Sequence, residues 1–204
     1  SMGKEMLKNK ELRMMGLVPY NLSDIQKGIQ FGHAVVEYSQ MIKKSNKITH
    51  INRYEDWADN WKTFIILNGG TSNHSVNRYQ PNEEFIGSME TNLETLKKAG
   101  IPVGVFYEPD LNDMLSGIVF VVQEEVFNKK DYPDFEDWVI ENYGGLLKVD
   151  TDNQSYAESS KQLSMMIKYS EDEHDQKIYN KWVDFVGGSS NAFMKEFLIN
   201  FSLA

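Results

Sequence analysis

Short apolar runs alternate with helical patterns over the first two-thirds of the chain, and this alternation is the feature that most constrains the fold. The apolar runs have the length of buried strands, whereas the segments between them repeat apolar residues at the spacing of an amphipathic helix. We expect strands at 12–18, 63–67, 101–107 and 117–122. We expect helices at 23–44, 54–61 and 85–98. This order of elements predicts an α/β domain in which helices cover a mixed sheet.

The first expected helix carries more polar side chains beside its apolar face than a helix that only packs on a sheet needs. At about 100° per residue, one broad apolar arc is shared by Ile25, Gly28, Ile29, Phe31, Gly32, Val35 and Val36. A polar stripe at the edge of this arc is formed by Gln26, Gln30, His33 and Glu37. We expect the arc to be buried. Each glycine costs roughly 1 kcal/mol in a helix interior, so we also expect Gly28 and Gly32 to contact a neighbouring backbone.

The polar residues of this helix resemble the signature of the type II peptidyl-tRNA hydrolases, in which a Lys-x-x-x-Gln-x-x-His-Ala run opens the first helix. Gln30, His33 and Ala34 match that pattern, Gln26 occupies the lysine position, and Lys27 follows one residue later. The order of elements over residues 12–123 is also that of the family. The resemblance implies a four-stranded mixed sheet flanked by helices, and hydrolysis of a peptidyl-tRNA ester.

The connection between the last two expected strands holds the second set of candidate residues. In the family it carries an Asp after the third strand, a Thr four residues later and a Gly before the last strand, and the corresponding residues here are Glu108, Asn112 and Gly117. A carboxylate at a strand end can orient a water molecule. We therefore predict Glu108 and Gln30 as catalytic residues. Turn formation is the alternative explanation for the neighbouring Asp110 and Asp113.

Further polar residues are candidates for binding a substrate. They are Lys27, Gln26, His33, Asn112, Asn68, Gly69 and Gly70. The last three open a long connection that runs to about residue 83, and glycines at the carboxyl end of a strand can offer backbone N–H groups to a phosphate. Two of the candidates have a structural alternative, because Ser23 and Gln26 fit a helix capping box and a single His33 beside an apolar face is often structural.

Charge is unevenly distributed along the chain, whose net charge is -9. Residues 1–62 hold ten Lys and Arg against seven Asp and Glu, whereas residues 124–175 hold five against fourteen. A polyanion such as tRNA would therefore meet the N-terminal part. The candidate contacts are Lys27, Lys43, Lys44, Lys47 and Arg53, although lysines at a helix end also complement the helix dipole.

Several other classes of protein are disfavoured by the composition. The chain has no cysteine, its four histidines are not at metal-ligand spacing, and it contains no Gly-x-Ser-x-Gly motif, so we predict no metal and no cofactor. It has no apolar run of about 18 residues and no apolar core of a signal peptide near its start. We therefore expect a cytoplasmic protein with no membrane partner.

A change of character near residue 127 predicts two parts, an α/β domain at 1–127 and a helical C-terminal extension at 128–204 packed on it. The extension shows helical patterns at 134–143, 156–169, 175–186 and 190–201. Two functions fit the sequence. The first is hydrolysis of peptidyl- or aminoacyl-tRNA esters, and the alternative is a non-catalytic module that binds a nucleotide-like ligand or a protein. The sequence leaves a homodimer open.

Overall fold

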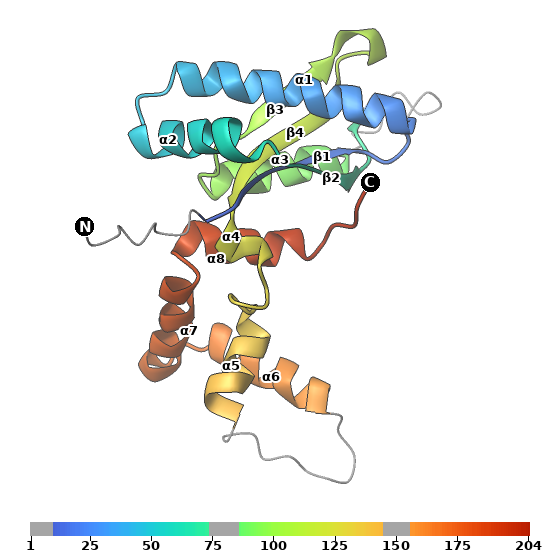
Figure 1. The fold of residues 1–204 in the computed structure, drawn as a ribbon. Coiled ribbons are helices and arrows are strands. Elements are labelled where there is room, and N and C mark those ends of the chain that lie inside the picture. Colours follow the sequence, from blue (N-terminus) through green and yellow to red (C-terminus); the bar gives the residue numbers. More distant parts are fainter. Residues whose placement is uncertain (1–9, 74–85, 145–155) are drawn as a thin grey trace, which may run out of the picture. The chain divides into compact units, whose positions relative to one another are not determined.

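A computed structural model describes residues 10–73, 86–144 and 156–204 (Figure 1). The chain divides into two compact units, Ser1–Glu124 with Asn200–Ala204, and Glu125–Ile199. The predicted boundary at residue 127 lies close to this division. The last five residues were not expected to belong to the first unit.

The first unit is built on a four-stranded mixed sheet, which confirms the predicted α/β class. Its strands are β1 (Leu12–Pro19), β2 (Phe64–Gly70), β3 (Gly104–Glu108) and β4 (Met114–Gln123), in the order β2-β1-β4-β3. Strand β1 pairs parallel with β2 and antiparallel with β4, and β3 pairs antiparallel with β4. The two central strands are buried along most of their length, as expected for a sheet that is covered on both faces.

Helices pack on both faces of this sheet (Figure 1). Helix α1 (Asp24–Lys43) packs on β3 and β4, and α2 (Ile48–Asp56) continues into the π-helical turn η1 (Trp57–Trp61) on the same core. On the other face, α3 (Ser88–Lys98) buries Met89, Leu93 and Leu96. The second helix thus begins six residues earlier than predicted, at Ile48 rather than Tyr54.

The buried side of α1 differs from the predicted apolar arc. Its buried residues are Gln30, Phe31, Ala34, Tyr38 and Ile42. Four members of the predicted arc are exposed instead: Gly28, and three large side chains, Ile25 by 76%, Ile29 by 43% and Val36 by 57%. The helix faces the sheet with the side that carries the small Ala34. On this side its backbone can come closer to the strands than it could with a bulky aliphatic residue between them.

Glycines of the sheet, not of the helix, provide this close approach. A Cβ on Gly117 would lie 2.7 Å from the Gln30 carbonyl oxygen, and a Cβ on Gly104 would meet the Ala34 carbonyl oxygen. By contrast, no atom of the described residues lies within 4 Å of a Cβ placed on Gly28 or Gly32. The prediction that these two helix glycines contact a neighbouring backbone is therefore wrong.

The C-terminus returns to the edge of the sheet. The last helix, α8 (Ser189–Leu198), ends at Leu198 rather than at the predicted residue 201. Beyond it, the backbone N–H of Asn68 donates to the Ser202 carbonyl over 2.9 Å, and the backbone N–H of Ala204 donates to the Ile66 carbonyl over 3.0 Å. The tail thus pairs with β2 and covers hydrogen-bonding groups that an edge strand would otherwise expose.

The second unit is helical and has its own core. Its helices are α4 (Glu124–Phe127), which begins one residue before the unit, α5 (Phe135–Tyr143), α6 (Tyr156–Lys168), α7 (Glu173–Phe185) and α8 (Ser189–Leu198). The core contains Trp182, whose indole N–H donates to the Pro133 carbonyl over 3.0 Å. A fully buried Lys195 ammonium lies 3.2 Å from an Asp134 carboxylate oxygen and also donates to the Val126 and Tyr132 carbonyls. No helix in the described part of the chain is both long enough and apolar enough to span a bilayer.

Candidate functional site

A chain of polar side chains joins α1 to the third and fourth strands. The Ser116 hydroxyl donates to Gln30 Oε1 over 2.6 Å, and Gln30 Nε2 donates to Glu108 Oε2 over 3.4 Å. Gln30 is only 2% exposed, and Ser116 is fully buried. The structure thus brings together the two predicted catalytic residues, although they are 78 positions apart in the sequence.

The close packing of α1 on β4 explains how Gln30 reaches this position. Gly117 lies under the Gln30 carbonyl, and a side chain there would hold the helix away from the strand. The preceding residue, Ser116, can therefore meet the Gln30 amide in the interior. Because a buried amide must find partners, the Ser116 hydroxyl and the Glu108 carboxylate together satisfy groups that would otherwise destabilise the core.

Glu108 is the last residue of β3 and is partly exposed. One of its oxygens accepts from Gln30. A carboxylate has about four acceptor positions, so this bond fixes the side chain and leaves capacity for a water molecule or a substrate hydroxyl. The arrangement can hold a carboxylate in a defined direction at the border between core and solvent.

The turn after Glu108 has the geometry of a tight connection. Pro109–Leu111 forms a single 3-10 turn, and the next two residues have left-handed backbones, with φ of 54° at both Asn112 and Asp113. Asn and Asp are the non-glycine residues that adopt this conformation most readily. Turn formation therefore accounts for both residues. Asn112 is exposed, and its binding of a substrate stays a prediction.

The beginning of α1 places the other candidates at different depths. Ser23 caps the helix as predicted, accepting from the Gln26 amide over 3.2 Å, and the exposed Gln26 side chain accepts from Gln30 Nε2 over 3.5 Å. The side chain of Lys27 is only 17% exposed and lies 4.0 Å from the Asp24 carboxylate. The side chain of Lys27 is thus mostly covered, whereas Gln26, at the family's lysine position, is exposed.

His33 packs against an aromatic side chain of the sheet. Its ring centroid lies 4.5 Å from that of Phe106 on β3, with an angle of 31° between the planes. This contact is what a structural histidine would make, and it also anchors α1 to the strand that ends at Glu108. A direct role of His33 in substrate binding stays a prediction.

The glycines that follow β2 are engaged within the protein. The Gly70 amide donates to the Asn68 side chain over 2.9 Å, and the Thr71 amide donates to the Ser88 hydroxyl at the start of α3 over 2.9 Å. Gly70 has a φ of +85°, and a Cβ on Gly69 would collide with Met89. Close packing of α3 explains both glycines. Phosphate binding by Asn68, Gly69 and Gly70 stays a prediction, and the rest of this connection lies outside the described residues.

Sequence reasoning missed Ser116 as a member of the site. A hydroxyl inside the apolar run of β4, directly before a glycine, is the signal that could have found it, because a buried hydroxyl requires a partner. Among the residues that the structure describes, no group of three or more His, Cys, Asp or Glu is placed to hold a metal ion.

Comparisons with known proteins do not assign the chain to a family. No family model, curated protein or solved structure matches it.

Proposed function

We propose that the first unit hydrolyses the ester of a peptidyl- or aminoacyl-tRNA, with Glu108 as the group that activates water. The observation that carries this proposal is the bond between Gln30 Nε2 and Glu108 Oε2, which holds a carboxylate at the end of a strand beside the first helix. The resemblance of the sequence to type II peptidyl-tRNA hydrolases names the same two positions. The order of the elements and the mixed sheet agree with that resemblance.

In the proposed reaction a water molecule donates a hydrogen bond to Glu108 and attacks the ester carbonyl carbon. Glu108 takes the water proton as the new C–O bond forms. The bond between the carbonyl carbon and the ribose oxygen then breaks, and the proton passes to that oxygen. The products are a free carboxylic acid and the ribose hydroxyl of the tRNA.

The buried position of Gln30 assigns it a supporting part in this reaction. With 2% of its surface exposed, it does not reach a substrate, so it acts as a positioning residue that orients Glu108. Ser116 in turn orients Gln30 through the bond to its carbonyl oxygen. Lys27 and Asn112 are the proposed contacts to the substrate, one from α1 and one from the turn after β3.

The phosphates of tRNA would bind to the basic residues of the first unit. Lys43 and Lys44 are exposed at the end of α1, and Lys47 precedes α2. If these residues neutralise phosphates, affinity falls by about 0.7–0.9 log units per log unit of salt for each phosphate. Reversing the charge of Lys43 and Lys44 should then reduce both tRNA affinity and its salt dependence.

The test is the release of free peptide from a peptidyl-tRNA by the full chain. Wild-type protein should release it, Glu108→Gln should not, and Asp110→Asn should behave as wild type, because Asp110 is an exposed carboxylate in the same connection. Loss of activity in both variants would show that the turn, rather than Glu108, is required. Absence of turnover by wild-type protein would remove the hydrolase proposal.

A non-catalytic module on the same fold is the second candidate, and one observation favours it. The amide nitrogen of Gln30 donates to Gln26 as well as to Glu108, so the network satisfies itself without a substrate. In that case Glu108 is a structural acceptor. The protein would then bind tRNA or a nucleotide-like ligand without cleaving an ester, and Glu108→Gln would change stability but not affinity.

A further inference from the structure

Helix α1 has a second apolar side, which faces away from the sheet. Its large side chains are the exposed Ile25, Ile29 and Val36. At about 100° per residue, these three and Gly32 lie within about 60° of one another, and the buried Ala34 points in the opposite direction. We call these four exposed or half-exposed residues (25, 29, 32 and 36) the outer ridge of α1. A contiguous exposed apolar row indicates an interaction surface, whereas a single exposed residue does not.

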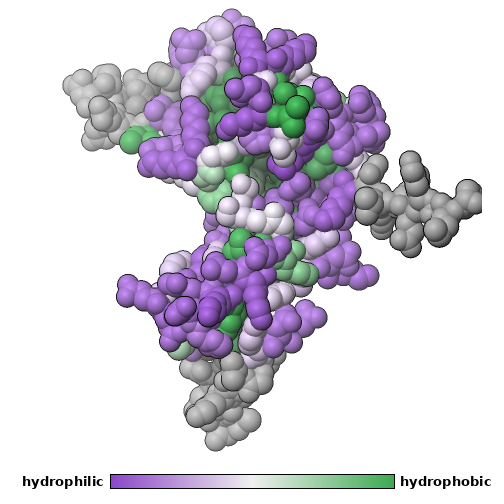
Figure 2. All heavy atoms as spheres, turned by 90° about the vertical axis from the view of Figure 1, so that its left-hand side faces the viewer, coloured by the Kyte–Doolittle hydropathy of each residue, from purple (hydrophilic) through white to green (hydrophobic). Residues whose placement is uncertain are grey.

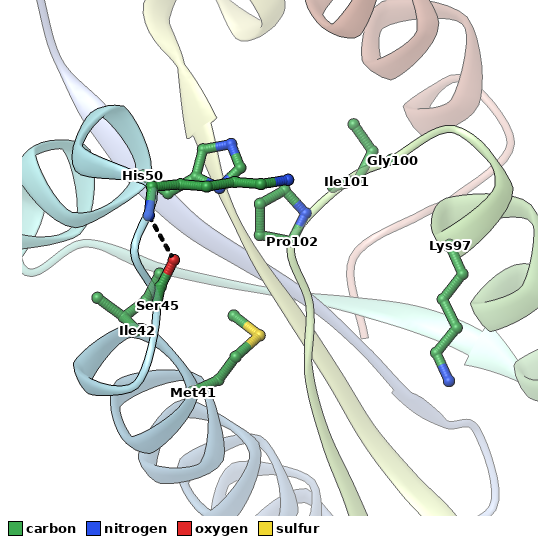
Figure 3. Close-up of a pocket in the computed structure, with 9 residues that line it drawn as sticks. Met41, Ile42, Ser45, His50, Lys97, Gly100, Ile101 and Pro102 are labelled. Atoms are coloured by element: carbon green, nitrogen blue, oxygen red, sulfur yellow. Dashed lines mark hydrogen bonds between the residues drawn. The ribbon is translucent and has the colours of Figure 1, made fainter.

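The outer ridge occupies only one part of the helix. In the last turn of α1 the apolar residues Met41 and Ile42 line a cavity together with Pro102, so they belong to the inner side of the helix (Figure 3). Figure 2 shows the first unit from the side of the turn between α1 and α2, where most of the surface is hydrophilic. An exposed apolar row is thus a feature of residues 25–36 and not of the whole helix.

Two glycines on this outer side have no explanation within the first unit. Gly28 and Gly32 lie in the interior of α1, where glycine is the least favourable residue after proline. A Cβ on either would meet no atom of the described residues within 4 Å. The distance between two packed helices depends on the side chains at their contact, and glycine allows the closest approach. Both glycines therefore fit a second helix that docks on α1 from outside.

The spacing of the outer ridge is the same in both directions along the helix. Its members follow one another at intervals of four, three and four positions, which is the spacing found where two helices pack side by side. If a second copy of α1 lies antiparallel on the first, Ile29 of each copy lies over Gly32 of the other. In the same register, Ile25 lies against Val36 of the other copy. Each contact thus occurs twice, as a twofold axis requires.

The charges of the first unit are compatible with this pairing. Asp24 and Glu37 each lie about 100° round the helix from their ridge neighbours, in opposite directions. A twofold axis places equal flanks of the two helices side by side, so these two carboxylates do not meet. The first unit carries 13 Lys and Arg against 15 Asp and Glu, whereas residues 125–199 carry 8 against 15. Little net charge therefore opposes association through the first unit.

The size of the contact sets its strength. The outer ridge spans eleven positions, or about 16 Å of helix at 1.5 Å per residue. A stable interface buries about 800 Å² on each partner and uses roughly 20–30 residues a side, which is more than this part of one helix supplies. The area therefore fits a weak dimer that forms and dissociates reversibly.

We propose that two copies of the chain form a weak dimer through the outer ridge of α1, with the two helices antiparallel. The inference does not rest on the proposed ester hydrolysis. Gln30 is buried on the inner side of the helix, and Lys43 lies opposite position 18 of the other copy, six positions before its α1 begins. The dimer thus leaves the proposed phosphate contacts at the end of α1 outside the paired helices.

Sedimentation velocity of the full chain over a wide range of concentrations tests this proposal. Wild-type protein should change from monomer to dimer as its concentration rises. Ile29→Gln should raise the dimer Kd about a hundredfold, because the substitution occurs in both copies and each loss weakens association about tenfold. Ile48→Gln is the matched control and should leave the Kd unchanged, since Ile48 is 71% exposed but lies on α2. A monomer at every concentration, or an equally stable dimer in Ile29→Gln, would overturn the proposal.

Gly32→Ala separates the interface from the stability of the helix. Alanine favours the helix, so hydrogen-exchange protection of the first unit should rise at concentrations where the chain is monomeric. The added Cβ lies under Ile29 of the other copy, so the dimer Kd should rise as well. A rise in protection with an unchanged Kd would refute the placement of Ile29 over Gly32.

Disulfide cross-linking measures the direction of the pairing, because the chain has no cysteine of its own. Ile25→Cys and Val36→Cys are mixed in equal amounts, oxidised gently and analysed by mass spectrometry. Antiparallel helices bring these two positions of different copies together, so the disulfide should form mainly between the two variants. Cross-linking mainly of each variant to itself would indicate parallel helices and overturn the proposed arrangement.

Discussion

Replacing Gly117 by alanine should separate α1 from the sheet and disturb the candidate site. The new Cβ would lie 2.7 Å from the Gln30 carbonyl oxygen and 2.9 Å from the Ala34 Cβ, whereas ordinary contact begins at 3.4 Å. The helix must therefore withdraw by about 0.7 Å, the difference between 3.4 and 2.7 Å. Neither contact can be relieved by rotating a side chain. Overpacking of this kind costs about 1–3 kcal/mol.

The matched control is the same substitution at Gly32. A Cβ there meets no atom of the described residues within 4 Å, and alanine is favoured over glycine in a helix interior. Gly32→Ala should thus stabilise the first unit by about 0.5–1 kcal/mol. The two variants exchange the same atoms and should change stability in opposite directions.

Native-state hydrogen exchange on peptides from β1 and β4 measures this difference within the first unit. A loss of about 2 kcal/mol lowers protection in Gly117→Ala about 30-fold. Because Gln30 moves with the helix, ester hydrolysis should fall as well. Protection in Gly117→Ala equal to that of wild type would refute the packing described for α1.

Three further predictions concern other contacts of the structure. Ser116→Ala should lower the stability of the first unit by about 1–3 kcal/mol, because the buried side-chain oxygen of Gln30, Oε1, loses its donor at 2.6 Å. Urea denaturation measures this loss, and a shift in midpoint no larger than that of an exposed Ser→Ala variant would contradict it. Burial raises the pKa of Tyr38 to about 12 from an ordinary value of 10, so the unfolded chain loses this proton first and stability is lost as the pH rises from 10 to 12. Tyr38→Phe should remove about 1.4 kcal/mol of that loss at pH 11, as measured by denaturation at pH 9 and 11, and identical pH profiles would argue against it. Lys195→Met should lower the unfolding free energy of the second unit, measured by hydrogen exchange, by about 3 kcal/mol, because it breaks a buried ion pair. Lys177→Met, at an exposed pair, should lower the same free energy by less than about 0.5 kcal/mol.

Most strands and helices were predictable from the local sequence. Buried strands are short apolar runs, whereas helices repeat apolar residues every three or four positions. The cap at Ser23 follows from local backbone chemistry in the same way. The start of α2 was missed because residues 48–53 are mostly polar and bury no side chain fully.

The rotation of α1 could not be predicted from its own sequence. Apolar residues occur on two sides of this helix, and its strongest apolar arc holds Ile25, Ile29 and Val36, which are exposed. The sheet decides which side is buried, because Gly104 and Gly117 admit the small Ala34. These glycines are 70 and 83 positions away from Ala34, and only the paired register of β3 and β4 places them together under the helix.

The candidate site was predictable in part. A carboxylate at the end of a strand and an amide on the first helix were found from the motif, and the fold joins them. Ser116 was missed because its role depends on the depth of Gln30. The depths of Lys27 and Gln26 depend on the same rotation of α1, so adjacent residues that look interchangeable in the sequence differ in the structure.

The rate of ester hydrolysis in a single turnover tests the central claim most directly, because excess enzyme separates the chemical step from binding. The measurement compares wild-type protein with Glu108→Gln on one peptidyl-tRNA, with tRNA affinity determined for both. A general base contributes about 10²–10⁴-fold, so the rate should fall by that factor while affinity stays the same. Equal rates, or no hydrolysis by wild-type protein that binds the tRNA, would contradict the assignment of Glu108.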